Sequence, residues 1–165
     1  MEVTIKNVIK YGFNPDYIKQ IVEEFYGDKI KSSFIIAMDG KLKHIAGRYR
    51  RSYTKRKVTI SPFQIDIVDK LGNKEHVWRM VDLYMEVNRF SAFFHILAHE
   101  LQHVIQFDMH FSIPTIMHNI SQQDYSKHFN STYYHNPKEA DAEKSAQEWG
   151  PVLYERYKEL IAGIK

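Results

Sequence analysis

Two histidines and a glutamate in this chain have a spacing that suits metal chemistry. They belong to the string His99-Glu100-Leu101-Gln102-His103, an HExxH motif. On an α-helix, residues four apart lie one turn above one another on the same face, so both imidazoles can reach a single ion. Glu100 falls at the edge of that face, where its carboxylate can contact a water on the ion. The motif therefore predicts a metal site in which Glu100 acts on water.

The residues around the motif have the pattern of a buried helix between Ser91 and Asp108. Its apolar side chains cluster on the side opposite the two histidines, and they are Phe94, Leu97, Leu101, Val104 and Ile105. Ser91 is the expected N-cap. An HExxH string also arises by chance in chains rich in histidine. The helical context and a suitable carboxylate downstream favour the metal interpretation.

A third metal ligand is expected from the C-terminal part of the chain. The sequence contains no cysteine, so a metal site must use histidine and carboxylate, and catalytic zinc commonly has three protein ligands. We favour Glu139, because Ala142 and Ala146 share its helical face and let two helices approach closely. Glu143 is then placed to bind a liganding imidazole. The reverse assignment, with Glu143 as ligand and Glu139 as a helix-capping residue, stays open.

These residues resemble those of a known enzyme family. HExxH followed by Glu139-Ala-Asp-Ala142-Glu143 looks like the gluzincin zinc metallopeptidases, and the compact size is similar to minimal gluzincins and ImmA/IrrE-type peptidases. The likeness covers two short motifs and their order. Glu143 stands where many relatives have aspartate, which leaves the third ligand open. The resemblance implies a zincin-like fold, bound Zn²⁺ and endopeptidase activity on peptides or proteins.

The resemblance also implies a mechanism. Zinc lowers the pKa of a bound water to about 7, and Glu100 serves as general base and then passes the proton to the leaving amine. The candidate donors to the developing oxyanion are Tyr133, Tyr134 and His135. An exposed sheet edge would hold the substrate as an added strand. His95, one turn before His99, is expected to be structural.

The rest of the chain predicts an α+β fold of one domain, residues 1–165. Strands are expected near residues 2–9, 34–38, 41–50, 58–60 and 63–67, and a helix begins at the Asn14-Pro15 pair and ends at Gly27. Asp39-Gly40 predicts a two-residue hairpin turn. We therefore expect a small, mostly antiparallel sheet packed on the HExxH helix.

Further helices are expected at residues 77–85 and from Pro137, with an interruption at Gly150-Pro151 before a last segment, 152–163. Residues 109–135 are irregular and suit a lid or substrate wall. The helices that follow from Pro137 would supply the third metal ligand.

Composition and charge narrow the functional classes. The chain has 165 residues, of which 44% are hydrophobic and 26% are charged, which is ordinary for a globular protein. It begins without a signal-peptide pattern and has no apolar run long enough to cross a membrane, so a soluble, cytoplasmic protein without a membrane partner is expected.

The net charge of +3 comes largely from residues Lys41–Lys57, where Tyr49 and Tyr53 are interleaved among the basic side chains and no acid is present. A solvated hairpin edge is the favoured interpretation. Nucleic-acid binding and an acidic or polyanionic substrate are the alternatives. A further alternative for the whole chain is a peptidase-like module that binds a protein partner without cutting it.

Overall fold

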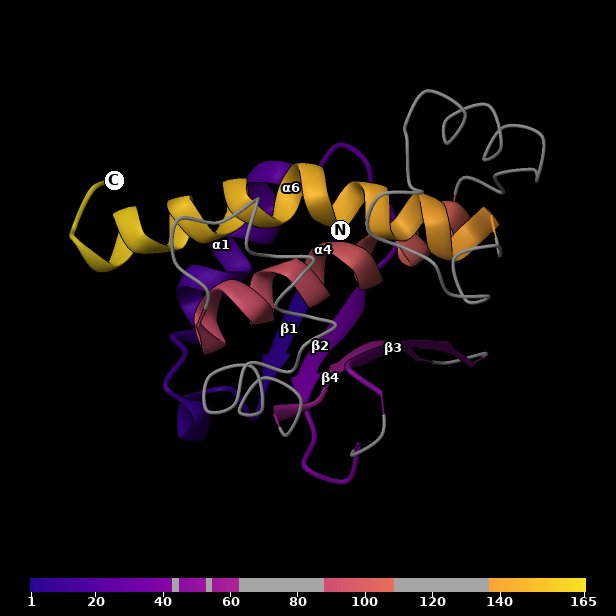
Figure 1. Cartoon of the computed structure of the whole chain (residues 1–165), viewed down its shortest axis with the longest axis horizontal. Helices are drawn as coiled ribbons and strands as arrows, with labels where there is room; N and C mark the ends of the chain where they lie inside the picture. Colours follow the sequence, from indigo (N-terminus) through magenta and orange to yellow (C-terminus); the bar gives the residue numbers. More distant parts are fainter. Residues whose placement is uncertain (43–44, 53–54, 63–87, 109–136) are drawn as a thin grey trace.

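The computed structural model of the protein describes residues 1–42, 45–52, 55–62, 88–108 and 137–165. In these residues the fold is α+β, with one four-stranded mixed sheet and three α-helices (Figure 1). The elements follow in the order β1 (Val3–Lys6), the 3₁₀ helix η1 (Ile9–Tyr11), α1 (Pro15–Tyr26), β2 (Phe34–Met38), β3 (Gly47–Arg51), β4 (Arg56–Ile60), α4 (Arg89–Asp108) and α6 (Pro137–Ile161).

The sheet has the order β1-β2-β4-β3, and two of its three strand pairs are parallel. Helix α1 connects β1 to the parallel strand β2, as a crossover between parallel strands requires. Among the strands that the structure describes, only β3 and β4 pair in the antiparallel sense. The prediction of a mostly antiparallel sheet is therefore wrong, although the α+β class is confirmed.

The Asp39-Gly40 pair forms a turn but does not join neighbouring strands. The Lys41 N–H donates to the Asp39 side chain at 2.9 Å, and the Leu42 N–H donates to the Asp39 carbonyl at 3.1 Å. Strand β4 then takes the place beside β2, because its buried Val58 and Ile60 belong in the core. The predicted hairpin is wrong, since a local turn signal does not determine which strand becomes the neighbour.

Helix α1 begins as the sequence predicts. Asn14 Oδ1 accepts hydrogen bonds from the backbone N–H groups of Asp16 and Tyr17, and Pro15 occupies the first helical position. The Asn14 N–H donates to the Tyr157 hydroxyl at 2.9 Å, which ties the start of α1 to α6. This helix and its cap are confirmed.

Helix α4 starts earlier than predicted, at Arg89, and Asn88 caps it. The Asn88 side-chain oxygen accepts from the N–H groups of Phe90 and Ser91 at 2.9 and 3.0 Å. Ser91 is not the cap, because its hydroxyl donates back to the Asn88 carbonyl inside the first turn. Every residue from Ser91 to Leu101 is buried, since the sheet covers one side of α4 and α6 packs along another.

Helix α6 runs without interruption through Pro151, so the predicted break is wrong. Proline removes one helical hydrogen bond. Packing of both halves of the helix offsets this loss: Ala142 and Ala146 lie against α4, and Leu153 and Tyr157 lie in the core shared with α1. The small residues of the first half let the backbones of α4 and α6 run close together.

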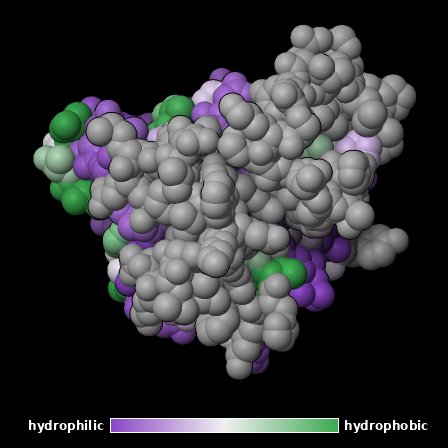
Figure 2. Space-filling model, viewed as in Figure 1, coloured by the Kyte–Doolittle hydropathy of each residue, from purple (hydrophilic) through white to green (hydrophobic). Residues whose placement is uncertain are grey.

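The core lies between the sheet and the helices. It includes Ile36 and Val58 from the sheet, Ile21 from α1, Phe94 from α4 and Leu153 from α6. Exposed apolar side chains gather at the C-terminal end of α6, where Ile161 and Ile164 lie (Figures 1 and 2). Within the described residues, no helix combines the length and apolar character needed to cross a bilayer.

Several predicted elements lie outside the described residues. These are the strand at 63–67, the helix at 77–85 and the irregular segment 109–135, together with the oxyanion candidates Tyr133, Tyr134 and His135.

Candidate metal centre

Helices α4 and α6 face one another with histidines on α4 and glutamates on α6. His95, His99 and His103 stand one turn apart on α4, and Glu139 and Glu143 stand one turn apart on α6. The side chains interleave, so each glutamate lies between two imidazoles. The i,i+4 spacing on both helices produces this alternation once the helices pack side by side.

His99, His103 and Glu139 converge on one point. His99 Nε2 lies 3.1 Å from Glu139 Oε2, and His103 Nε2 lies 3.4 Å from Glu139 Oε1. One ligand atom from each of the three residues falls within 4.8 Å of the others. Donor atoms around a tetrahedral ion with bonds of about 2.0–2.1 Å lie roughly 3.3 Å apart. The three residues therefore offer donor types that zinc takes, and the two distances to Glu139 are close to the separation found around such an ion.

Glu143 lies between His95 and His99, on the opposite side of the His99 ring from Glu139. Its carboxylate oxygens lie 3.0 Å from His95 Nε2 and 3.2 Å from His99 Nδ1, and the residue is 2% exposed. Burial alone would raise the pKa of Glu143. The charge and hydrogen bonds of His95 and His99 outweigh burial and hold this pKa well below its usual range. Glu143 is therefore a carboxylate that orients His99.

The pKa of His99 is raised to about 10. Burial acts in the opposite direction, but hydrogen bonds to Glu139 and Glu143, and the charges of Glu143 and Glu100, favour the protonated ring. Without a metal, the His99 ring thus carries a proton on each nitrogen: Nδ1 donates to Glu143 and Nε2 donates to Glu139. A cation at Nε2 would take the place of one of these protons.

Glu100 lies beside this cluster, against strand β3. It is 5% exposed, and the Tyr49 backbone N–H donates to its carboxylate. Burial raises the pKa of Glu100. The charge of Glu139 also raises this pKa. The charges of His99 and His103 and the hydrogen bond from the Tyr49 backbone act in the opposite direction and offset part of the rise. A carboxylate with a raised pKa accepts a proton more readily than an ordinary glutamate does.

Gly47 lets β3 approach Glu100. A Cβ atom at this position would lie 2.7 Å from Ile96 Cγ2 and 2.8 Å from Glu100 Oε1, which is closer than side chains tolerate. The sheet edge reaches α4 because residue 47 has no side chain.

We expect Gly47→Ala to lower the free energy of unfolding by about 1–3 kcal/mol, because Ile96 or Glu100 must move out of its packed position. Chemical denaturation measures this change. Gly40→Ala is the matched control, since its Cβ would meet Tyr11 Oη at an ordinary 3.6 Å. Equal losses for the two variants would contradict the close approach of β3.

Gln106 fixes the orientation of His103. Its side-chain N–H₂ donates to the Lys138 carbonyl at 2.9 Å and to Asp141 Oδ2 at 2.8 Å. Its oxygen therefore faces His103 Nδ1, 2.9 Å away, and that nitrogen must be the donor. Nε2 is left as the atom that faces Glu139. The same side chain thus orients one candidate ligand and holds the turn of α6 that carries another.

We expect Gln106→Leu to weaken zinc binding by about 10–100-fold, as loss of groups that orient metal ligands does. Competition with a chromophoric chelator measures this affinity. Gln102→Leu is the matched control, because Gln102 also donates to Asp141, at 2.8 Å, but is not hydrogen-bonded to a candidate ligand in the described part of the chain. The role of Gln106 is refuted if the two variants bind zinc equally.

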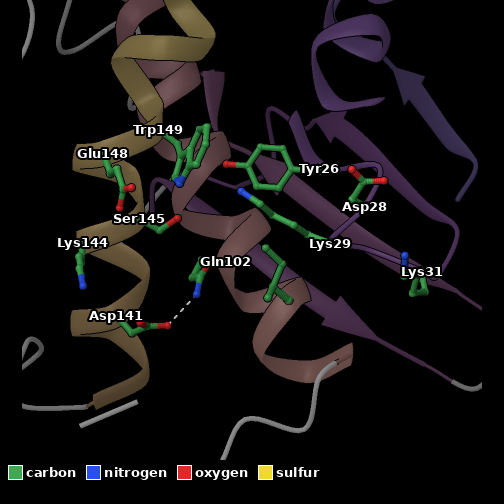
Figure 3. Close-up of a pocket in the computed structure, with 11 residues that line it drawn as sticks. Tyr26, Asp28, Lys29, Lys31, Gln102, Asp141, Lys144, Ser145, Glu148 and Trp149 are labelled. Atoms are coloured by element: carbon green, nitrogen blue, oxygen red, sulfur yellow. Dashed lines mark hydrogen bonds between the residues drawn. The ribbon is translucent and has the colours of Figure 1, made fainter. Parts of the chain in front are cut away.

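A hollow of about 470 Å³ lies between α4, α6 and the end of α1 (Figure 3). Gln102 and Asp141 point toward one another at its edge, and Lys29 lies over the Trp149 ring at 3.9 Å. The residues that line it include none of His99, His103 and Glu139. The hollow is therefore separate from the candidate metal centre, although both touch the Asp141 network.

The structure brings His99, Glu100, His103, Glu139 and Glu143 together where α4 and α6 meet. His95, expected to be structural, contacts Glu143 rather than packing alone. Sequence reasoning missed Gln106, Asp141 and Gly47. The i,i+3 spacing of His103 and Gln106 is a signal for the first. Nothing local in the sequence marks the other two.

Comparisons of the chain with protein-family models, with curated proteins and with solved structures found no match.

Proposed function

We propose that the protein is a zinc-dependent endopeptidase of gluzincin type. The observation that carries the proposal is the convergence of His99, His103 and Glu139 from two helices, within 4.8 Å of one another. Glu100 lies next to this group but outside it, which is the place of a proton acceptor rather than a ligand. Two imidazoles and a carboxylate are a donor set found in catalytic zinc sites.

In this proposal His99, His103 and Glu139 hold the ion, and Glu143 and Gln106 orient the two imidazoles. The proposal favours Glu139 as the third ligand, because Glu139 faces Nε2 of both histidines, whereas Glu143 faces Nδ1 of His99. The donor set accepts several divalent metals, among which zinc fits its composition.

The ion supplies Lewis-acid activation of a water and of the substrate carbonyl. Glu100 accepts the proton of the attacking water and delivers it to the amine that leaves. Its raised pKa helps it to perform both steps. Burial in the site keeps the carboxylate away from bulk water, which strengthens its interactions with the reacting groups.

The zincin-like arrangement is part of the proposal. It rests on the position of β3, which is an edge strand of the described sheet and lies beside the HExxH helix. A substrate in extended conformation would add to this edge and pass Glu100.

The experiment has two parts. Elemental analysis of protein purified without added metal should find one zinc per chain, which chelation removes. A broad peptide library should then be cut by the zinc-loaded protein and not by the chelated protein. Zinc without cleavage of any peptide would refute the peptidase and leave a module that binds a partner; absence of any bound divalent metal would refute the metal site.

A further inference from the structure

The strand that lies beside Glu100 is strongly basic. Strand β3 carries Arg48, Arg50 and Arg51, and its antiparallel partner β4 begins with Arg56 and Lys57. The two strands form a hairpin at the edge of the sheet, beside α4 (Figure 1). We call these five residues the basic hairpin.

Part of this charge is already used in the fold. Arg56 pairs with Asp108 at the end of α4, and the Arg51 guanidinium lies 4.0 Å from the centre of the Phe107 ring. The remaining charges are Arg48, Arg50 and Lys57. Within the residues that the structure describes, no carboxylate forms an ion pair with them.

The register of β3 against β4 places two positive charges opposite one another, which does not help the chain to fold. Arg50 stands directly opposite Lys57 in the antiparallel pair, and like charges in this position destabilise a sheet. Arg50 is exposed, so a neutral side chain would fit its place equally well. An anionic partner at the hairpin would remove this repulsion and form charge-assisted hydrogen bonds with the guanidinium groups.

The geometry connects this charge to the candidate metal centre. Gly47 of β3 lies against Glu100, and Tyr49 and Arg51 contact Phe107, so these three residues face α4. Arg48 and Arg50 alternate with them and lie on the other face of the strand. A strand advances about 3.4 Å per residue. A peptide paired along β3 past Glu100 would direct every second side chain to the face that carries Arg48 and Arg50, so residues close to the bond to be cut would come within reach of both arginines.

An acidic peptide fits this surface better than a nucleic acid does. The Tyr49 hydroxyl is buried and its ring packs against Phe107, so Tyr49 does not offer a face on which bases could stack. The edge of a sheet instead offers backbone groups that pair with an extended peptide.

We propose that the basic hairpin selects substrates with glutamate or aspartate within about three residues of the bond that is cut, through Arg48, Arg50 and Lys57. This inference rests on the proposed peptidase function and adds its substrate class.

The test uses two labelled peptides with a central alanine–leucine pair. Glutamates flank the pair in one peptide, and glutamines replace them in the other. Fluorescence anisotropy measures their binding to the full chain loaded with zinc, with Glu100→Gln used so that neither is consumed. We expect the glutamate peptide to bind about tenfold more tightly at low salt, and the preference to shrink as salt rises.

Arg50→Glu, in the same Glu100→Gln background, should abolish or reverse the preference. Lys19→Glu, which makes the same charge change on the exposed face of α1, should leave it unchanged. Equal binding of the two peptides would overturn the inference, as would equal preferences in the two charge variants. Tighter binding of a single-stranded or duplex oligonucleotide than of the glutamate peptide, lost in Arg50→Glu, would overturn it in favour of a nucleic-acid surface.

Cleavage by the protein with Glu100 intact separates this inference from the proposed function. If both peptides are cut at equal rates, the charge preference is refuted and the peptidase stands. If the glutamate peptide binds with the expected preference but is not cut with zinc present, the peptidase is refuted and the acidic-peptide surface stands.

Discussion

Replacing Glu100 by glutamine should lower the rate of peptide cleavage by about 10²–10⁴-fold. The amide keeps the shape of the side chain but cannot accept the proton of the attacking water. Zinc content should stay the same, because Glu100 lies outside the group formed by His99, His103 and Glu139. Turnover of a library-derived peptide by zinc-loaded protein measures the change.

The same variant should not lose stability. Burial raises the pKa of Glu100, so the ionised form is costly where it lies, and a neutral amide does not carry this cost. Glu155→Gln is the control for activity, since Glu155 is an exposed residue of α6 paired with Lys158. Full activity in Glu100→Gln would show that the proton acceptor is another group, whereas equal losses in both variants would point to a contaminating peptidase.

Glu143→Ala should be the most destabilising single substitution at the centre. It removes a buried carboxylate that lies 3.0 Å from His95 and 3.2 Å from His99, and leaves both imidazoles without this partner. Loss of one member of a buried ion pair costs about 3–5 kcal/mol. Urea denaturation of the metal-free protein measures the change in the free energy of unfolding.

The matched control for Glu143→Ala is Glu148→Ala, an exposed position on the same helix. Its effect should stay within about 0.5 kcal/mol. Glu143→Gln separates charge from volume, because the amide fills the same space. If Glu143→Ala costs less than about 1 kcal/mol, then the histidine–glutamate alternation between α4 and α6 does not stabilise the fold.

Local sequence determined the residues of the candidate centre. The i,i+4 spacing of His99 and His103 requires only that the segment be helical, and helical periodicity is encoded over a few turns. The same holds for the second helix, where the spacing of Glu139 and Glu143 places both on one face. The cap of α1 at Asn14 was likewise predictable, because its hydrogen bonds are local.

Tertiary packing decided the arrangement of the sheet. Asp39-Gly40 signals a turn, but the choice between β3 and β4 as the neighbour of β2 depends on which strand buries more apolar surface. Strand β4 takes the position beside β2 because its Val58 and Ile60 are buried there, and β3 with its arginines becomes the edge strand. The continuity of α6 through Pro151 has the same cause, since contacts with α4 and α1 compensate for a lost backbone hydrogen bond.

The network around the two imidazoles also depends on packing. Gln106 on α4 donates hydrogen bonds to the Lys138 carbonyl and to Asp141 on α6 only because the two helices lie side by side, and these bonds turn its oxygen toward His103. Gly47 matters only because β3 crosses Glu100 at a distance that leaves no room for a Cβ atom. The chain alone thus determined the candidate ligands and proton acceptor, through spacings within single helices. The groups that orient them come from other elements, and only long-range packing brings those elements together.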